Sequence, residues 1–445
     1  MAAKGIGRGG LGVYRWLLLW GVAAVALLPA CPASNATTTR NTAAIADVAS
    51  GKLTEAKASW WGYDSRDATA CLQAAISSGV PRLIVDDVRT PWNVDPITLR
   101  SNQVIVFERG VEVVARRGSF RGKADCLFSA YDAENITLEG PGATLRMRRD
   151  DYTRSGYERG EWRMVLSFRG CSNVSISGLT LAESGGDGIY LGSSEGEKPC
   201  VDVRISGVTC TRNYRQGISV VNAENLLIED CLFRDTRGVS PQAGIDFEPN
   251  RATERLVNCL VRNCVSVGNA GNGFAFYLPR LTQRSEPVSI RLENCRSYSS
   301  RANGMHLFTL NRPQSAPSGS VEFDRCTFVG NTRSGVRITD KPDTACRVIF
   351  RHCAIDGNAP NWPQDGQINF QNKPDSQHEI GGVDFEHCTI RDTRERPPIA
   401  YLDRAGGLPL ADITGSLTIY RDGRSETVNI SERLLADWTG ARVRQ

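Results

Sequence analysis

Two acidic residues stand close together near the middle of the chain. Asp246 and Glu248 are separated by one residue, and an extended strand places side chains with this spacing on the same side. Carboxylates held this close disfavour each other's ionisation, so one of them can stay protonated and serve as a general acid. Asp246 is therefore the first candidate for a catalytic residue, followed by Glu248.

A third acidic residue, Asp187, comes directly before Gly188 at the start of another strand-like segment. If two strand spacings of a stacked sheet separate Asp187 from Asp246, the two lie roughly 10 Å apart. Inverting glycosidases separate their two carboxyl groups by roughly 6.5–9.5 Å. Asp187 could thus form an acid/base pair with Asp246 or Glu248. Because Asp-Gly is also an ordinary turn pair, a purely structural role for Asp187 is the alternative.

The same part of the chain carries residues that suit sugar binding. Aromatic rings pack on the apolar faces of sugars, and guanidinium groups form two-pronged bonds with carboxylates. The candidates for substrate binding are Tyr190, Arg215, Gln216, Tyr277, His306 and Arg337. An ordinary solvated strand face would carry Thr, Ser and Lys instead, so this mixture favours a functional groove.

These residues also allow a different reaction. A lyase or epimerase needs a base beside a uronate carboxyl group and a cation that neutralises that carboxyl group. His306 with a nearby tyrosine could supply the base, and Arg215 or Arg337 could supply the cation. The polar residues alone therefore leave hydrolysis, elimination and epimerisation open.

The candidate residues lie on a repeat. An apolar or cysteine anchor recurs every 23 to 35 residues, and a strand that begins with glycine follows it. The anchors are Leu179, Val208, Cys231, Cys264, Cys295, Cys326, Cys353 and Cys388. The glycines are Gly188, Gly217, Gly244, Gly273, Gly304 and Gly335. One such unit cannot bury its apolar side alone, whereas units stacked about 4.8 Å apart can, so the repeat predicts a single-stranded parallel β-solenoid with two strands per unit.

Two columns of this repeat have a clear physical meaning. A turn column contains Asn135, Asn173, Asp202, Asn225, Asn258, Ser289 and Ser320. Asn and Asp tolerate left-handed backbone and bond to their own turn, which suits a repeated corner. The six anchor cysteines are expected to stack inside the solenoid as free thiols, although neighbouring coils are close enough for disulfides.

The N-terminal segment predicts export. Lys4, Arg8 and Arg15 precede an apolar run over residues 16–30 that is too short to span a membrane comfortably. We expect residues 1–30 to be a signal peptide. Leu28-Pro-Ala-Cys31 resembles a lipobox, so Cys31 could carry a lipid anchor, with ordinary cleavage as the alternative. The mature protein would then be periplasmic, an outer-surface lipoprotein or secreted.

The rest of the chain divides into three expected parts. Residues 31–57 show no helix or strand period and are expected to form a flexible linker. Residues 58–405 are expected to form the solenoid, and residues 406–445 its C-terminal cap. A short amphipathic helix within Ser65–Ser78 would cover the first coil, because an open solenoid end exposes unpaired strand edges. The segment Arg146–Arg163 interrupts the repeat as a loop, which could clamp an acidic sugar or pack as a lid.

Composition limits the partners and cofactors. A net charge of +4 is small for 445 residues and gives no reason to expect nucleic acid. Only seven of the 53 basic residues are lysines, and the rest are arginines. Genomic base composition is the simplest explanation. The alternative is that guanidinium groups bind the carboxylates of an acidic substrate. There is no Cys-x-x-Cys pair, and the four histidines form no metal spacing, so no metal or other cofactor is expected. Loose acidic residues alone neither support nor exclude calcium. We expect a monomer whose only route to a membrane is a lipid on Cys31.

The chain resembles the pectin-lyase-like superfamily from about Trp60 to Asp403. The opening Asp64-Ser-Arg-Asp-Ala-Thr69, the segment Ile97–Asn102 and Phe107-Glu-Arg-Gly110 are similar to the start of polygalacturonase-like proteins of glycoside hydrolase family 28. The resemblance implies a right-handed parallel β-helix and a polysaccharide substrate.

The catalytic motifs match this family only in part. Gly186-Asp-Gly-Ile189 resembles the family's Asn-Thr-Asp-Gly strand. The family's paired Asp falls on Arg215-Gln216, its Gly-His-Gly becomes Gln242-Ala-Gly244, and its Arg-Ile-Lys is absent. The segment Gly244–Pro249 also resembles the acidic-His motif of mannuronan C5-epimerases, without the histidine.

Together these features predict an exported carbohydrate-active β-helix that hydrolyses glycosidic bonds with paired carboxylates on one sheet face. A polysaccharide lyase or C5-epimerase acting on a uronate polymer is the first alternative. A non-catalytic glycan-binding or adhesion protein is the second, because many solenoids only bind.

Overall fold

The structure is a computed structural model that describes residues 36–312 and 315–441. The expected signal peptide, Cys31 and the first residues of the expected linker lie outside this part of the chain. Within the described ranges, no helix is long and apolar enough to cross a membrane.

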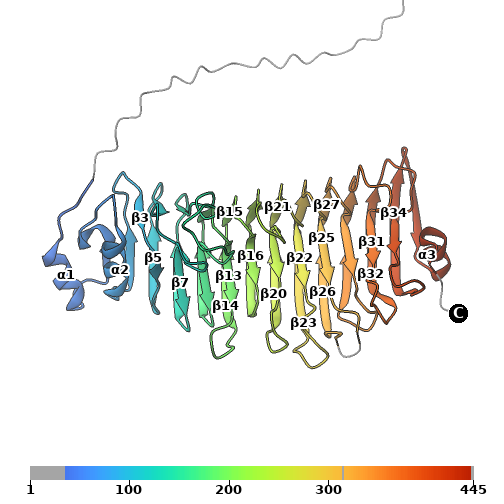
Figure 1. Ribbon diagram of the computed structural model, residues 1–445, viewed down its shortest axis with the longest axis horizontal. Coiled ribbons are helices and arrows are strands. Elements are labelled where there is room, and N and C mark those ends of the chain that lie inside the picture. The colour runs from blue at the N-terminus through green and yellow to red at the C-terminus, as the bar shows by residue number, and fades with distance from the viewer. Residues whose placement is uncertain (1–35, 313–314, 442–445) are drawn as a thin grey trace, which may run out of the picture. The chain divides into compact units, whose positions relative to one another are not determined.

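The described chain forms a parallel β-solenoid whose coils stack side by side along its long axis (Figure 1). Each complete coil contains three strands, as in β14 (Cys200–Ser206), β15 (Thr209–Thr211) and β16 (Gln216–Val220). The first two strands of a coil belong to a 24-stranded sheet and the third to an 11-stranded sheet. The all-β parallel solenoid predicted from the repeat is confirmed.

The first strands of successive coils form one column of the larger sheet. They are β1 (Glu55–Lys57), β2 (Arg82–Val85), β5 (Gln103–Phe107), β8 (Glu134–Glu139), β11 (Ser172–Ser177), β14, β17 (Ala223–Glu229), β20 (Leu256–Arg262), β23 (Val288–Glu293), β26 (Gly319–Asp324), β29 (Arg347–Arg351), β32 (Ile380–Arg391) and β34 (Leu410–Arg421). Their parallel pairing continues without a break from β1 to β34.

The middle strands form a second column in the same sheet. They are β3 (Trp92–Val94), β6 (Glu112–Ala115), β9 (Thr144–Arg146), β12 (Thr180–Ala182), β15, β18 (Leu232–Arg234), β21 (Val265–Val267), β24 (Arg296–Tyr298), β27 (Thr327–Val329) and β30 (Ala354–Asp356). The expectation of two strands per unit was wrong because it missed this column. Most of these strands have three residues, which is too short to show an alternating pattern.

The third strands form the 11-stranded sheet. They are β4 (Ile97–Thr98), β7 (Phe128–Tyr131), β10 (Leu166–Arg169), β13 (Asp187–Gly192), β16, β19 (Ile245–Phe247), β22 (Phe274–Tyr277), β25 (Met305–Phe308), β28 (Val336–Thr339), β31 (Ile368–Gln371) and β33 (Ile399–Leu402). This sheet contains most of the candidate site residues.

The anchor column fills the interior. Leu179, Val208 and the six anchor cysteines are all buried. The thirteen cysteines of the described chain are free and buried, as predicted for interior thiols. Phenylalanines stack between coils in the same way, since the rings of Phe323 and Phe350 lie 4.7 Å apart and nearly parallel. Equivalent side chains therefore pack on one another from coil to coil.

The glycine column allows the coils to stack this closely. A Cβ atom on Gly188 would lie 2.7 Å from the carbonyl oxygen of Gly217 in the next coil. The same contact would arise between Gly244 and Gly273, and between Gly273 and Gly304, at 2.7 and 2.6 Å. Real Cβ atoms do not approach a backbone oxygen this closely, so any other residue would push the coils apart.

The turn column agrees with its prediction in five of seven positions. Asn135, Asn173, Asp202, Asn225 and Asn258 have φ between 51° and 55°. Their side chains also bond between coils, as Asn173 Nδ2 does with Asn135 Oδ1 at 2.7 Å. Ser289 and Ser320 are absent from the positive-φ residues and pair directly between β23 and β26, so the backbone there stays extended.

The N-terminal end is covered by helices. Helix α2 (Thr69–Ser77) buries Leu72, Ala75 and Ile76 and so confirms the predicted capping helix. The described part of the expected linker is ordered, which corrects that expectation. It contains α1 (Thr42–Ala49), the 3-10 helix η1 (Ala58–Trp61) follows it, and β1 pairs with β2. Helix α1 buries only Val48, so its sequence shows no clear apolar face, and β1 and η1 have only three and four residues.

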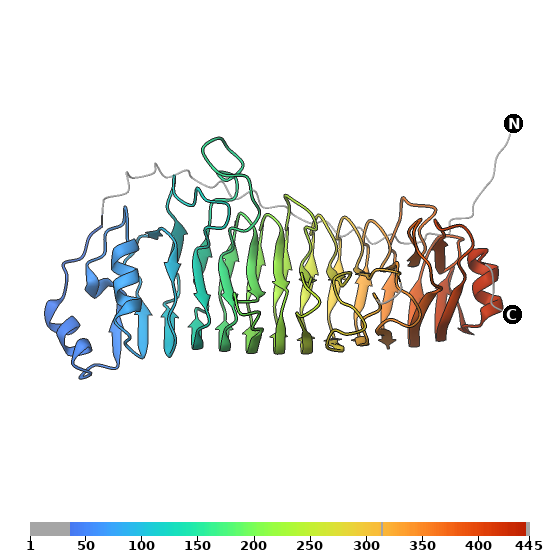
Figure 2. The ribbon, with the colours of Figure 1, turned by 60° about the horizontal axis from the view of Figure 1, so that its bottom comes forward.

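The C-terminal end is closed by a hairpin and a helix. Strand β34 continues the solenoid to Arg421, beyond the expected limit at residue 405, and β35 (Arg424–Asn429) folds back on it in antiparallel fashion. Helix α3 (Glu432–Thr439) follows, with Ser431 as its N-cap and Leu435 buried. Figure 2 shows α2, in blue, and α3, in red, at opposite ends of the solenoid.

The glycine column generates a prediction about stability. Gly273→Ala should destabilise the fold by about 1–3 kcal/mol, because the new methyl group meets the Gly304 carbonyl and Ser297 Oγ. Gly196→Ala is the matched control, since no atom lies within 4 Å of its added Cβ. Urea unfolding followed by circular dichroism measures both. Equal midpoints for the two variants would contradict the steric role of this column.

Candidate functional site

The 11-stranded sheet aligns four of the nine candidate residues in one row: Tyr190, Asp246, His306 and Arg337. Its strand register pairs Tyr190 with Ser219, and Ser219 with Asp246. The complete row runs Thr98, Ser129, Ser167, Tyr190, Ser219, Asp246, Ala275, His306, Arg337, Asn369 and Ala400. We name it the outward row. Since adjacent strands lie about 4.8 Å apart, Asp246 and His306 are about 10 Å apart along it.

A guanidinium group lies among the candidate carboxylates. Arg215 Nη1 and Nη2 each donate to one carboxylate oxygen of Glu248 at 2.6 Å. Arg215 Nη1 also lies 3.5 Å from Asp187 Oδ2, and Arg215 Nε lies 3.5 Å from Glu161 Oε1. A two-pronged bond of this kind fixes the orientation of Glu248 as well as its position. We refer to Asp187, Asp246, Glu248 and Arg215 as the acid cluster.

Strand β16 links the two sides of the acid cluster. Ser219 Oγ donates to Asp187 Oδ2 at 2.7 Å and accepts from Arg215 Nη1 at 3.2 Å. Gln216 Nε2 donates to Glu248 Oε1 at 2.9 Å. Because β16 lies between β13 and β19, these two side chains bridge the strands that carry Asp187 and Asp246.

Both aspartates of the acid cluster are sealed from solvent. Asp187 is 0% exposed and Asp246 is 2% exposed. Burial raises the pKa of Asp246 well above its usual value, and the Glu248 carboxylate raises it further. Burial also raises the pKa of Asp187 to about 7, although Arg215 opposes that shift. Asp246 is therefore the carboxyl group that holds its proton at neutral pH.

Arg215 is stabilised as a cation by its surroundings. Burial alone would lower its pKa, but the carboxylates of Asp187 and Glu248 raise it above its ordinary value. A buried charge of this kind requires partners, because an isolated ion is expensive to remove from water. The fixed positive charge of Arg215 is thus what permits several carboxyl groups to share one buried site.

Three oxygens around the acid cluster are buried without a hydrogen-bond partner among the described residues. They are Asp187 Oδ1, Asp246 Oδ1 and Gln216 Oε1. Each unsatisfied buried polar group costs about 1–3 kcal/mol. An arrangement that served only stability would have replaced such groups by apolar ones. Groups left in this state, with displaced pKa values, are typical of functional sites.

The connection between β9 and β10 covers the acid cluster. Within it, Glu161 approaches Arg215, and Met164 Sδ accepts a hydrogen bond from the Asp187 backbone N–H at 3.0 Å. Gly186 packs so closely that a Cβ atom there would meet the Glu161 carbonyl and lie 3.0 Å from the Arg163 nitrogen. The cover therefore rests directly on the start of β13.

Arg163 fixes this connection in place. Its guanidinium is buried and donates to four backbone carbonyls, those of Phe120, Arg121, Glu158 and Gly160. The Tyr152 ring also lies 5.2 Å below the guanidinium carbon. The segment Arg146–Arg163 was expected either to clamp an acidic sugar or to pack as a lid. In the structure it packs as a lid on the solenoid.

A pocket lies beside the acid cluster, between the lid and the solenoid. Its volume is about 320 Å³. It is lined by Arg149, Tyr152, Thr153, Arg159, Gly160, Gly185 and Tyr214. Gly185, two residues before Asp187, is the pocket's lining residue on the chain segment that leads into β13. Its two arginines and two tyrosines are of the kinds expected to contact a sugar.

The second half of the outward row has a different character. His306 Nε2 lies 2.9 Å from Thr339 Oγ1. Burial lowers the pKa of His306 to about 3, and the nearby Arg337 and Lys373 cations lower it further, so the ring is neutral at physiological pH. Arg337 donates to the neutral Gln371 amide. Tyr277 is 48% exposed and packs its ring 5.1 Å from that of Phe308, which forms an open aromatic surface.

The structure thus divides the nine candidate residues into groups. Five lie together in or directly against the acid cluster: Asp187, Arg215, Gln216, Asp246 and Glu248. Tyr190 lies in the outward row but is nearly buried, with the Arg169 guanidinium 4.4 Å from its ring. The others, Tyr277, His306 and Arg337, belong to strands β22 to β28 further along the sheet.

Sequence reasoning missed several residues of the site. Glu161 and Met164 come from the lid, whose sequence shows no repeat. Arg169 and Gln371 lie on strands that were not identified as members of the row. Arg169 could have been found by extending the register one strand before β13. Nothing in the sequence around Glu161 indicates its contact with Arg215.

Metal binding has no geometric support in the described ranges. Among residues 36–312 and 315–441, no group of three or more His, Cys, Asp or Glu side chains is arranged to hold a metal ion. Arg215 and Gln216 bind Glu248, and Ser219 binds one oxygen of Asp187.

Solved structures with a similar architecture include an epimerase module and an exopolygalacturonase. The family model described as "Right handed beta helix region" matches residues 165–284. The A-module of mannuronan C-5 epimerase AlgE4 from Azotobacter vinelandii aligns with a TM-score of 0.58 at 16% identity, over 80% of this chain and 91% of that chain. The family 28 exopolygalacturonase from Yersinia enterocolitica aligns with a TM-score of 0.55 at 12% identity, over 84% of this chain and 76% of that chain. These similarities confirm the right-handed parallel β-helix, and at such identities they show the fold alone.

Curated relatives match only part of the chain. The uncharacterized protein YclG of Bacillus subtilis (strain 168) is 30% identical over 153 residues, which are 31% of this chain and 26% of YclG. A probable polygalacturonase of Arabidopsis thaliana is 28% identical over 134 residues, which are 30% of this chain and 28% of that protein. The matched region therefore spans less than a third of each relative's length.

The buried Asp187 generates a prediction about pH. Its pKa is raised from about 4 to about 7 on folding, so the folded state binds this proton more tightly than the unfolded state. Stability should therefore fall as the pH rises from about 4 to about 7, and Asp187→Asn should remove that part of the loss. Urea unfolding at pH 4.5, 6 and 8 measures the effect, with the exposed Asp230→Asn as control. Parallel pH curves for the native protein and Asp187→Asn would refute it.

Proposed function

We propose that this chain is an exported protein that hydrolyses glycosidic bonds in a polysaccharide with its acid cluster. The observation that carries this proposal is the buried pair of carboxyl groups, Asp246 and Asp187, whose pKa values are both displaced upward. Export rests on the predicted signal peptide at residues 1–30, and the polysaccharide substrate on the fold shared with polygalacturonases and epimerases.

The pair can divide the chemistry between them. Protonated Asp246 would give its proton to the glycosidic oxygen as the bond from that oxygen to the anomeric carbon breaks. Asp187, ionised above its pKa of about 7, would take a proton from the water that attacks this carbon. The two residues lie on strands separated by β16, and the register also offsets them by three residues along the strand direction. A water could stand between two carboxyl groups so placed, as the inverting mechanism requires.

Arg215 and Glu248 would act through position and charge. Glu248 is fixed by two bonds from Arg215 and one from Gln216, so its carboxylate cannot turn away from Asp246. Its negative charge helps to keep Asp246 protonated, and Arg215 limits the repulsion on Asp187. A substrate would approach through the pocket beside Gly185, with the lid displaced from the acid cluster. Lids that close over such sites also exclude water.

A uronate lyase or C5-epimerase is the second candidate. The neutral His306 favours it, because an imidazole that is unprotonated at neutral pH can accept the C5 proton of a uronate. Arg337 follows His306 in the outward row and would neutralise the carboxylate that activates this proton. A glycan-binding protein without catalysis would use the same surface but release no product.

Asp246→Asn tests the hydrolase. The substitution keeps the shape of the side chain but removes the transferable proton, so turnover should fall by about 10²–10⁴-fold. Reducing ends released from a panel of neutral and acidic polysaccharides provide the measurement. Asp230→Asn, an equally conservative change at an exposed turn, should keep full activity.

The products separate the three candidates. Release of reducing ends without ultraviolet absorbance identifies hydrolysis, and absorbance of an unsaturated uronate identifies a lyase. Changed NMR signals without chain cleavage identify an epimerase. Normal turnover by a folded Asp246→Asn protein would end the role assigned to Asp246. Binding of glycans with no product at all would leave only the binding protein.

A further inference from the structure

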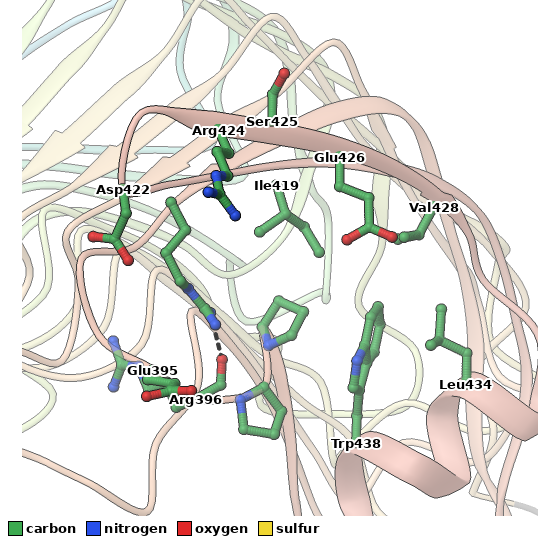
Figure 3. A pocket seen from close by; sticks show the side chains of 13 residues that line it. Glu395, Arg396, Ile419, Asp422, Arg424, Ser425, Glu426, Val428, Leu434 and Trp438 are labelled. Carbon is green, nitrogen blue, oxygen red and sulfur yellow. Dashed lines mark hydrogen bonds between the residues drawn. The ribbon is translucent and has the colours of Figure 1, made fainter.

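A second pocket lies at the C-terminal end of the solenoid, far from the acid cluster. Its volume is about 920 Å³. Three elements form it: the loop before β33, the hairpin of β34 and β35, and helix α3. Figure 3 shows the Trp438 side chain rising from α3 into the pocket, towards Glu426 on β35. This volume is in the range of ligand sites, which is about 300–1,000 Å³.

The walls combine apolar surface with charges of both signs. The apolar lining residues are Pro397, Pro398, Ile419, Val428, Leu434 and Trp438. The exposed rim includes Asp422, Arg424 and Glu426. Arg421 donates to the Arg396 carbonyl at 2.6 Å, but its Nε is buried without a partner among the described residues.

This lining matches the chemistry of a sugar. A pyranose ring presents an apolar C–H face that packs on an indole, and its hydroxyl groups both donate and accept hydrogen bonds. Carboxylates and guanidinium groups on the same rim satisfy both roles. A nucleic acid or an anionic membrane would instead select a single sign of charge, which this rim does not have.

The pocket continues towards the outward row. An adjoining pocket of about 200 Å³ shares Arg396, Pro397 and Trp438 with it. This smaller pocket reaches Asp365 and Ala400, and Ala400 is the β33 member of the outward row. Five strand spacings separate β33 from Asp246 on β19, which corresponds to about 24 Å. The two pockets thus lead from the solenoid cap onto the face that carries the acid cluster.

We infer that the two adjoining pockets form a glycan-binding groove that holds the polysaccharide beyond the acid cluster. Trp438 provides the stacking surface, and Arg421, Arg424 and Glu426 bind the hydroxyl or carboxylate groups of the sugar. The identity of the ligand rests on the proposed function, whereas the groove itself rests on its own lining. The groove anchors a polymer whose chain runs along the outward row.

Binding to the full chain carrying Asp246→Asn tests this groove, because turnover does not then disturb the measurement. Isothermal titration calorimetry with hexasaccharides of galacturonate, mannuronate and xylose gives the affinities. Trp438→Ala should weaken binding of the preferred hexasaccharide at least fivefold, as expected for the loss of a stacked ring. Because Trp438 also packs against the core, the exposed pair Arg424→Ala and Glu426→Ala provides a second test that leaves the cap intact.

Tyr298→Ala is the control, since Tyr298 is also an exposed aromatic residue, 40% accessible, but lies on β24 in the other sheet. It should leave the affinity unchanged. Unchanged affinity in both the Trp438 and the Arg424/Glu426 variants would overturn the groove, and so would failure of all three hexasaccharides to bind. Normal turnover by Asp246→Asn would overturn the proposed hydrolase instead, and the binding results would still decide the groove.

Discussion

The close approach of successive coils at the glycine column is the constraint on which the rest of the structure depends. From Gly188 to Gly304, a Cβ atom added to each glycine of the column would lie no more than 2.7 Å from the carbonyl oxygen of the glycine in the next coil. Every third strand must therefore begin at the same place in its coil. Side chains at equal distances from the glycine then fall into rows one strand spacing apart. The outward row is a direct consequence, because Tyr190, Asp246 and His306 each stand two residues after such a glycine.

Stacking places equivalent side chains of successive coils next to one another. The consequence depends on whether those side chains point into the solenoid or away from it. In the interior, stacked cysteines and phenylalanines gain packing without cost, because apolar side chains tolerate their own copies. At the corners, Asn side chains bond from coil to coil. On the outward face, the carboxyl groups of Asp187, Asp246 and Glu248 gather at one site and would repel one another. Arg215 resolves this conflict by binding Glu248 in two-pronged fashion while standing 3.5 Å from Asp187. The acid cluster can therefore be buried without every one of its carboxyl groups being protonated.

The sequence could predict the features that recur in every coil, but not the segments that are short or do not repeat. The solenoid, the interior cysteines and the row containing Asp246 and His306 were predictable, because each recurs with the coil. The three-residue middle strands have too few residues to show a period, and helix α1 buries only Val48 and so shows no apolar face. The burial of Asp187 and Asp246 was not foreseeable, because the lid that covers them has no repeat and is fixed by backbone bonds from Arg163. The C-terminal groove was not predicted either, because its walls are a loop, a hairpin and a helix that do not repeat with the coil.

The position of Arg215 also bears on how this site differs from the family it resembles. Where polygalacturonase-like sequences have a paired aspartate, this chain has Arg215-Gln216, and both side chains bind Glu248. The exchange replaces a negative charge by a positive one, which offsets the additional carboxylate on β19. With Asp246 protonated and Glu248 paired to Arg215, Asp187 is the one carboxyl group of the cluster that titrates near neutral pH. The cluster thereby keeps two carboxyl groups with raised pKa values, although the strand between them lacks the acidic pair of the family it resembles. A change of charge on one strand is balanced here by a residue close to the next strand.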